Sequence, residues 1–258
     1  GTLGILCEMT LRLLPLPESM GTVLVSFDAF SKAADLADGI FNSRMLPAAI
    51  EVMDATLFGT MTDVAPGFDP GKWVVAVGLE AFSEAMTRME GEISDMADDI
   101  GAVGRAQLDD HGHLRFWLAV SDLLPGLLAG TPGLVNAKLT YPISKWREVV
   151  ESAVRTLSEN GIDHGIQAHA GSGICQINLI PKDGDGEFAG RAVKAVGDLR
   201  AQCAALSGRL FIQQAPVGMK NDLDIWGEPG PEFILIKRLK QGLDPNGIMS
   251  PGRFVGGL

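Results

Sequence analysis

Two stretches with the same plan decide the fold: TVLVSFDAFSKA at residues 22–33 and WVVAVGLEAFSEA at residues 73–85. In each stretch a run of β-branched and apolar residues, typical of a strand, leads into a hexapeptide that begins a helix. The hexapeptides, DAFSKA and EAFSEA, start at residues 28 and 80. The shared strand–helix junction indicates two β-α-β units and therefore an internal structural repeat.

Two more β-α-β units follow towards the C-terminus. Strands are predicted at residues 134–140, 165–168, 174–180 and 210–214, and helices at about 142–160 and 187–206. Four such units packed as two pairs favour an α+β fold: duplicated ferredoxin-like halves that form an antiparallel sheet with helices on one face. A parallel doubly wound sheet is the alternative, but no strand here leads into the glycine-rich phosphate loop typical of that fold.

Composition excludes some classes of partner. The 258 residues include 21 Lys and Arg against 32 Asp and Glu, a formal charge of -11. An acidic surface repels phosphate backbones, so we expect no nucleic-acid partner. No apolar stretch reaches the roughly 18 to 20 residues that span a bilayer. Three widely separated cysteines form no disulfide framework, which favours a cytoplasmic location.

Both ends of the chain resemble one family. The opening GTLGILCEMTLRL (residues 1–13) is similar to the last stretch of the FAD-binding domain in FAD-linked oxidases of the vanillyl-alcohol-oxidase type. Residues 239–257, which contain LDPNG and SPGRFVGG, are similar to the C-terminal signature of that family. The sequence DIWG at residues 224–227 resembles the FAD-binding subunit of glycolate oxidase in particular.

The resemblance implies a domain plan. Residues 1–17 would be the terminal strand of an FAD-binding domain that is otherwise absent from the chain. Residues 18–230 would form a cap or substrate domain, with its two β-α-β pairs at about 21–109 and 134–215. Residues 231–258 would be a closing helix and tail that return to the FAD domain. Nothing here corresponds to the family's main diphosphate-binding loop, so we expect the chain alone to bind FAD weakly or not at all and to be inactive.

The resemblance also implies a function. We expect the C-terminal part of an FAD-dependent oxidoreductase that acts on a small 2-hydroxy acid of the glycolate or D-lactate type, within a glycolate oxidase complex. The alternative is a non-catalytic assembly subunit that docks a catalytic flavoprotein and an iron–sulfur partner. A small-molecule sensor whose ends match by chance is a third possibility. A subunit of such a complex would be cytoplasmic, or peripheral at the inner membrane through its partners.

Candidate cofactor residues follow from the same resemblance, which places the opening segment against FAD. Gly1 and Gly4 let the main chain approach a ligand closely, Thr2 adds a hydroxyl group, and Ile5 completes the motif. Without the resemblance, the glycines would indicate only a bulge or a packing point. Arg253 could bind a flavin or substrate oxygen by bidentate hydrogen bonds, or form a salt bridge that fixes the tail.

His169 is the candidate catalytic residue. It begins the sequence HAGSGICQ, where metal-using relatives carry a His-x-Gly-Asp-Gly-Asn-x-His arrangement. Ser172, Ile174 and Gln176 replace the Asp, the Asn and the second His, so we predict that no metal binds. An imidazole with a pKa near 6.5 can still take or give a proton. The alternative is a histidine whose hydrogen bonds are satisfied within its turn.

Two further charged clusters are expected to carry no site chemistry. His111 and His113 follow two aspartates, a pattern that is more often a solvated turn than a metal site. The run of Lys237, Arg238 and Lys240 is expected to be a solvated helix face.

Overall fold

The structure is a computed structural model that describes residues 1–258, apart from the side chain of Thr62. The chain divides into two units. One is Pro17–Leu223, and the other combines Gly1–Leu16 with Asp224–Leu258. Each unit is described by itself below. The predicted cap domain ended at residue 230, whereas residues 224–230 group with the C-terminal tail.

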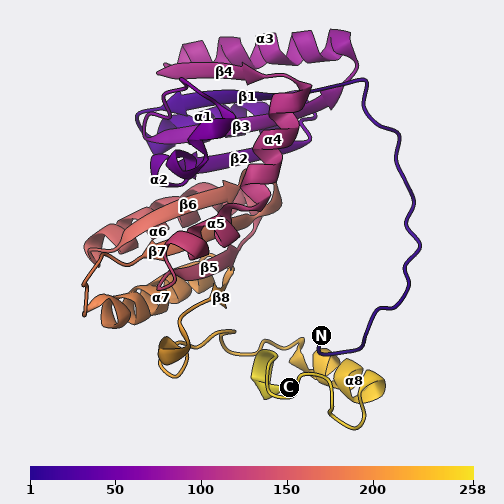
Figure 1. Cartoon of the computed structure of the whole chain (residues 1–258), viewed down its shortest axis with the longest axis vertical. Helices are drawn as coiled ribbons and strands as arrows, with labels where there is room; N and C mark the ends of the chain where they lie inside the picture. Colours follow the sequence, from indigo (N-terminus) through magenta and orange to yellow (C-terminus); the bar gives the residue numbers. More distant parts are fainter. The chain divides into compact units, whose positions relative to one another are not determined.

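All eight strands belong to one antiparallel sheet in Pro17–Leu223, in the order β4-β1-β3-β2-β6-β7-β5-β8 (Figure 1). The strands are β1 (Ser19–Phe27), β2 (Ala49–Asp54), β3 (Trp73–Ala81), β4 (Gly104–Leu108), β5 (Val135–Thr140), β6 (Asp163–His169), β7 (Ile174–Ile180) and β8 (Arg209–Gln214). Read from the outer edges, β4-β1-β3-β2 and β8-β5-β7-β6 are the same arrangement, joined where β2 meets β6. The predicted duplicated α+β fold is confirmed.

Four helices pack beside these strands, two on each half of the sheet. They are α1 (Phe30–Phe41), α3 (Ser83–Ile100), α6 (Trp146–Glu159) and α7 (Phe188–Ala205). Contacts of α1 with α3 and of α6 with α7 make one pair per half. The pairs meet where Nε1 of Trp146 donates a hydrogen bond to Asp38 at 2.8 Å and Arg147 forms an ion pair with the same carboxylate. These contacts join the two halves across the helical layer.

The opposite face of the first half has its own cover. It comes from α2 (Ala55–Phe58), a 3-10 helix at Gly59–Val64, α4 (Asp110–Ser121) and α5 (Leu123–Gly130). Leu24, Met53, Phe58 and Phe116 form a core with these segments, and each is at most 1% exposed. The first half is therefore covered on both faces, because the segment between β4 and β5 supplies a second apolar layer.

The two hexapeptides mark strand–helix junctions, as predicted, but the helices begin late within them. Helix α1 begins at Phe30, and Asp28 forms an ion pair with Lys32 at 3.0 Å rather than capping the helix. Helix α3 begins at Ser83, because Glu80 still belongs to β3. The repeat is therefore one of topology, while the helix starts differ locally.

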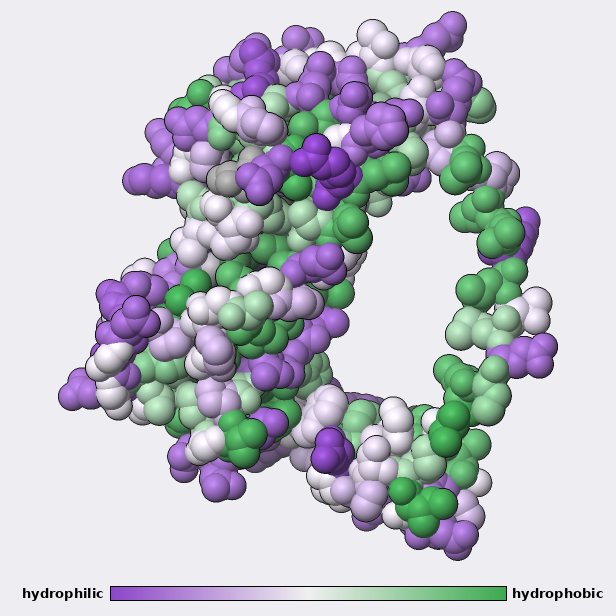
Figure 2. Space-filling view, in the orientation of Figure 1, coloured by the Kyte–Doolittle hydropathy of each residue, from purple (hydrophilic) through white to green (hydrophobic). Residues whose placement is uncertain are grey.

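Residues 1–16 contain no strand in this structure, so their predicted role as the terminal strand of an FAD-binding domain stays a prediction. A strand needs a neighbour to receive its backbone hydrogen bonds, and the described part of this unit has no other strand. The apolar side chains of the segment are largely exposed and are seen as the green run that leads from the N-terminus in Figure 2. The most exposed are Ile5, Leu6, Leu11, Leu13, Leu14 and Leu16.

A buried lysine organises the smaller unit, which contains α8 (Phe233–Leu243). Lys240 was predicted to be solvated, but it is 8% exposed, and its Nζ donates to Asp244 at 2.6 Å. The same Nζ donates to the carbonyl oxygens of Thr2 and Met249 at 2.7 Å each. The hydrogen bond from Lys240 lowers the pKa of Asp244 to about 2. The two terminal motifs are therefore tied together by one ammonium group.

Candidate functional site

The candidate site lies at the seam between the two halves of the sheet. Three residue pairs join β2 to β6: Glu51 with His169, Val52 with Ala168, and Met53 with Gln167. Side chains alternate between the faces of a strand, so Glu51, His169 and Gln167 share one face. This face is opposite to the one on which Val52 and Ala168 pack. The seam thus brings together polar side chains that are more than a hundred residues apart in the sequence.

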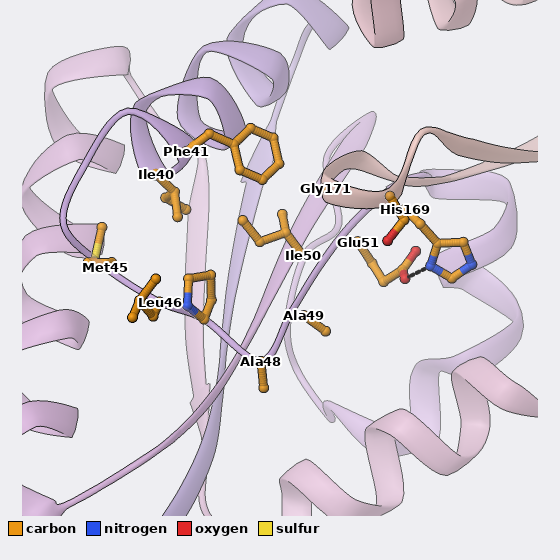
Figure 3. Close-up of a pocket in the computed structure, with 12 residues that line it drawn as sticks. Ile40, Phe41, Met45, Leu46, Ala48, Ala49, Ile50, Glu51, His169 and Gly171 are labelled. Atoms are coloured by element: carbon orange, nitrogen blue, oxygen red, sulfur yellow. Dashed lines mark ion pairs between the residues drawn. The ribbon is translucent and has the colours of Figure 1, made fainter. Parts of the chain in front are cut away.

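Glu51 is a carboxylate buried in the sheet. Its side chain is 3% exposed, and Oε1 forms an ion pair with Nδ1 of His169 (Figure 3). Its second oxygen, Oε2, accepts a hydrogen bond from Nε2 of Gln167 at 3.1 Å. A buried charge is costly unless it is paired and hydrogen-bonded, and both oxygens of Glu51 meet that condition.

The pairing changes the acid–base properties of both groups. The hydrogen bond and charge of Glu51 raise the pKa of His169, in spite of burial and of the charge on Lys138, which act in the other direction. Burial raises the pKa of Glu51 and outweighs the hydrogen bond from His169. Because Nδ1 faces the carboxylate, Nε2 is the nitrogen left for other partners, and the His169 side chain is 37% exposed. The arrangement can therefore exchange a proton at Nε2.

A cavity of about 390 Å³ borders the pair. Its wall is mostly apolar, with polar groups contributed by the seam and by the turn after β6. It is lined by Ile40, Phe41, Met45, Leu46, Pro47, Ala48, Ala49, Ile50, Glu51, His169, Gly171 and Ser172. Figure 3 shows the imidazole and the carboxylate together at one end of this set, away from Ile40, Phe41 and Met45. An apolar wall with a few convergent polar groups is typical of a small-molecule site.

Gln176 stands where the second histidine of the metal-using motif would be. It lies on β7 opposite Gln167, and its Oε1 is buried without a hydrogen-bond partner among the described residues. The described residues contain no group of three or more His, Cys, Asp and Glu side chains that could hold a metal ion. That His169 acts without a metal stays a prediction.

The other histidine cluster has a structural role. His113 is buried, and its Nδ1 lies 2.9 Å from the carbonyl oxygen of Gly21 and 3.0 Å from Oγ1 of Thr22. Trp117 donates to the same hydroxyl oxygen at 3.0 Å. These bonds fix α4 against β1, while His111 is exposed. His111 is solvated as predicted, but both histidines lie in helix α4 rather than in a turn, and His113 is buried.

The predicted cofactor residues belong to the other unit, Gly1–Leu16 with Asp224–Leu258. The carbonyl oxygen of Thr2 accepts from Lys240, and a side chain at Gly4 would meet no atom within 4 Å. Ile5 is 80% exposed, and Gly1 lies near Ser250. The opening segment therefore presents accessible main chain, as a contact to a ligand or to another domain requires.

Arg253 lies in the turn before the C-terminus. Its backbone N–H donates to the carbonyl oxygen of Ser250 at 3.3 Å, and its side chain is exposed. Among the described residues it forms no ion pair within 4.0 Å, so the tail is held by Lys240 instead. The guanidinium group is free to meet a carboxylate or a flavin oxygen, and that role stays a prediction.

Sequence reasoning missed Glu51. The residue lies in AAIEVMD at residues 48–54 and is not among the candidate site residues that the sequence indicates. A single carboxylate within an otherwise apolar strand was the available signal, because such a group must find a buried partner. Its partner could not be read from the sequence, since it depends on the register between β2 and β6.

Comparison with known proteins gives a consistent match. Residues 16–254 match the family described as FAD linked oxidases, C-terminal domain. The chain is 27% identical over 263 residues to a probable mitochondrial D-lactate dehydrogenase of Danio rerio, covering 99% of this chain and 52% of the relative. It is 23% identical over 268 residues to glycolate oxidase subunit GlcD of Escherichia coli K12, with the same coverage of both chains. The chain thus spans about half the length of these curated relatives.

Solved structures show the same fold. The structure of p-cresol methylhydroxylase with substrate bound matches with a TM-score of 0.61 at 15% identity, over 93% of this chain and 53% of that one. Alkyldihydroxyacetonephosphate synthase matches with a TM-score of 0.55 at 16% identity, over 96% of this chain and 47% of that one. The sensor alternative, which required the ends to match by chance, is wrong, because the family match extends over residues 16–254.

Proposed function

We propose that this chain, which belongs to the family of FAD-linked oxidases as their C-terminal domain, forms the substrate side of an FAD-dependent oxidoreductase for a small 2-hydroxy acid. The names of its relatives support glycolate or D-lactate as the substrate class. The observation that carries the proposal is the Glu51–His169 pair at the border of a 390 Å³ cavity. This site has the size and the proton-exchanging group that oxidation of a small hydroxy acid requires.

The reaction divides between cofactor and protein. When bound, a flavin accepts a hydride equivalent from the carbon that carries the hydroxyl group. The hydroxyl proton must leave as the C=O bond of the 2-oxo acid forms, and Nε2 of His169 is the group proposed to take it. Arg253 is proposed to pair with a substrate carboxylate or a flavin oxygen.

The opening segment fits a limited role in holding FAD. Gly4 has open space at its Cβ position, so a planar or phosphate group can approach the main chain there. Gly1, Thr2 and Ile5 flank it on accessible backbone. Among the residues that the structure describes, Lys240 alone bonds this segment through an ammonium group, and its hydrogen bonds are already satisfied by Thr2, Asp244 and Met249. We propose that these residues contact the cofactor while most of its binding energy comes from outside the 258 residues.

The test is turnover by a holoenzyme that contains this chain. Glycolate-dependent and D-lactate-dependent dye reduction should be lowered by His169→Gln about a hundredfold in kcat, because a general base typically contributes 10²- to 10⁴-fold. Arg253→Ala should raise KM for the hydroxy acid. His111→Gln is the matched control, since it removes an exposed imidazole. Unchanged activity in both site variants would contradict the catalytic proposal.

The second candidate function is a non-catalytic assembly subunit that docks a catalytic flavoprotein and an iron–sulfur partner. Gln176 favours it, because the replaced histidine would complete the metal pair of the metal-using motif. Normal turnover of the assembled complex with His169→Gln and Arg253→Ala combined, together with loss of the complex when α8 is altered, would support this alternative.

Location is part of the same proposal. Among the described residues no helix is both long enough and apolar enough to cross a membrane. We propose a cytoplasmic protein that reaches the inner membrane only through partner subunits. Fractionation of cells that express the tagged complex, with and without its partners, tests this location.

A further inference from the structure

The Glu51–His169 pair has the connectivity of a base with an orienting carboxylate. Oε1 of Glu51 contacts Nδ1 of His169, and Oε2 is held by Gln167 at 3.1 Å. The carboxylate comes from β2 and the imidazole from β6, directly opposite each other in the register. Because both backbones belong to the sheet, the geometry does not depend on a loop.

His169 is the charged group that pairs with Glu51, because the other titratable neighbours of Glu51 are neutral. Its other titratable neighbours, Tyr141 and Cys175, are buried, and burial raises the pKa of both, so both are neutral at physiological pH. Lys138 on β5 is the one other charge that acts on His169, and it opposes protonation. The imidazole therefore lies between one buried anion and one more distant cation.

The buried position of Glu51 has no structural explanation apart from this pair. A side chain that is 3% exposed at a β-sheet seam would be most stable as an apolar residue. Val52, the next residue of β2, is apolar and fully buried on the other face of the strand, as expected for a residue inside a sheet. A carboxylate at this place costs desolvation energy that only His169 and Gln167 offset.

We propose that Glu51 is a positioning residue: it holds the Nδ1–H tautomer of His169, leaves Nε2 free for a substrate, and stabilises the imidazolium formed when Nε2 takes the hydroxyl proton of the substrate. This inference deepens the proposed function and rests on it. In the proton step the substrate O–H bond breaks and an Nε2–H bond forms, while Glu51 remains ionised. The imidazolium then loses the proton from Nε2 to water. The same division of roles between histidine and carboxylate operates in catalytic triads.

The decisive experiment is NMR titration of the four histidine rings in the full chain, with the His169 signal assigned by its loss in His169→Gln. In the wild type the His169 midpoint should lie above the ordinary value, and its neutral form should be the Nδ1–H tautomer. In Glu51→Gln the midpoint should fall. Asp54→Asn is the matched control, because it neutralises another buried carboxylate of β2 that does not contact His169, and it should leave the midpoint in place. An unchanged midpoint in Glu51→Gln would overturn the proposal.

Turnover of the holoenzyme gives a second readout. Glu51→Gln should lower kcat at least about tenfold with little change in KM, and the rising limb of its pH profile should move to lower pH. A rising limb at the same pH as in the wild type would overturn the positioning role. If the wild-type holoenzyme oxidises no hydroxy acid, the proposed function fails, while the NMR titration still decides the role of Glu51.

If Glu51→Gln folds poorly, the variant of its partner, His169→Gln, tests the pairing instead. His169→Gln leaves the carboxylate buried without its cation, and burial raises the pKa of Glu51, so the loss of stability relative to wild type should grow as pH rises from 5 to 7 and ionisation of the unpaired carboxyl is increasingly favoured in the unfolded state. Urea unfolding at the two pH values measures the difference. An equal loss at both would contradict the pairing.

Discussion

Asp54 shows at the residue scale how one carboxylate can join several elements. Its Oδ1 accepts from the backbone N–H of Leu57 at 2.9 Å and so caps α2, while Oδ2 accepts from Ile166 of β6 at 2.8 Å. The residue is 8% exposed, and burial raises its pKa to about 6. Asp54 is therefore a second link between the two halves of the sheet, beside the Glu51–His169 pair.

The raised pKa of Asp54 predicts the pH dependence of stability. Between about pH 4 and pH 6 the folded state binds more protons at this group than the unfolded state does. The free energy of unfolding should therefore fall as pH rises through this window, by at most about 3 kcal/mol from Asp54, and then level off. Urea unfolding at pH 4.5 and pH 7 checks this, and the decrease should be smaller in Asp54→Asn. Equal slopes in the two proteins would refute the assignment.

Gly173 offers a second prediction at this scale. It ends the turn after β6 with φ of +64°, and an added Cβ would collide with the carbonyl oxygen of Tyr141. Gly173→Ala should destabilise the protein by about 3 kcal/mol, because backbone strain and the clash add. Gly184→Ala is the control: its φ is +74° with no atom within 4 Å, so only about 1 kcal/mol is expected. Thermal unfolding of both variants measures the difference, and equal losses would exclude the clash.

At the scale of elements, the smaller unit depends on the contacts of α8. Lys240 on this helix bonds the carbonyl oxygen of Thr2, the carboxylate of Asp244 and the carbonyl oxygen of Met249. Asp244 also accepts from the backbone N–H of Ile248 and Met249 at 3.0 and 2.9 Å. The LDPNG motif is thus a hydrogen-bonded turn built around one ion pair.

Removing the ammonium group should release the opening segment. Lys240→Met should increase proteolytic cleavage within residues 1–16 roughly tenfold, since local opening then costs fewer contacts. Arg238→Met, on an exposed position of the same helix, should leave the rate unchanged. Because the pKa of Asp244 is lowered to about 2, the wild-type contact should persist as pH falls to about 4 and be lost between 4 and 2. Equal cleavage rates of Lys240→Met and Arg238→Met would contradict the role of Lys240 in holding the opening segment.

The element plan was largely predictable from the sequence. Alternating β-branched runs such as residues 73–79 bury both faces of a strand, and the apolar stripe of residues 146–157 predicts α6. The unpaired state of residues 1–16 was not predictable, because an apolar alternation shows only that the segment can pair. Whether it pairs depends on a neighbouring strand, and the described residues of its own unit contain none.

At the scale of the whole molecule, the fold places the candidate site where two copies of one topology meet. The seam joins β2 of one half to β6 of the other through three residue pairs only. Glu51 and His169 meet there, and they line the cavity together with Gly171 and Ser172 of the neighbouring turn. The second half of the sheet can therefore present His169 to a ligand while the first half, covered on both faces, remains a rigid support.

The division of the chain predicts its behaviour towards flavin. The 258 residues cover about half of their curated relatives, and the opening segment offers accessible main chain without a cluster of cations. The purified chain should retain flavin at well below one equivalent, measured by absorbance near 450 nm after gel filtration. A full equivalent that co-purifies with the chain would show that its own residues hold the cofactor.

The sequence by itself determined the duplicated strand–helix plan and the family, and it indicated His169 as the candidate catalytic residue, a role that stays a prediction. Each of these depends on local periodicity or on short motifs, which are properties of neighbouring residues. Only the tertiary structure decided that Glu51 is the partner of His169, that His113 is structural and that Lys240 is buried. These depend on strand register and on helix packing, which bring together groups that are distant in the chain and whose burial sets their charge.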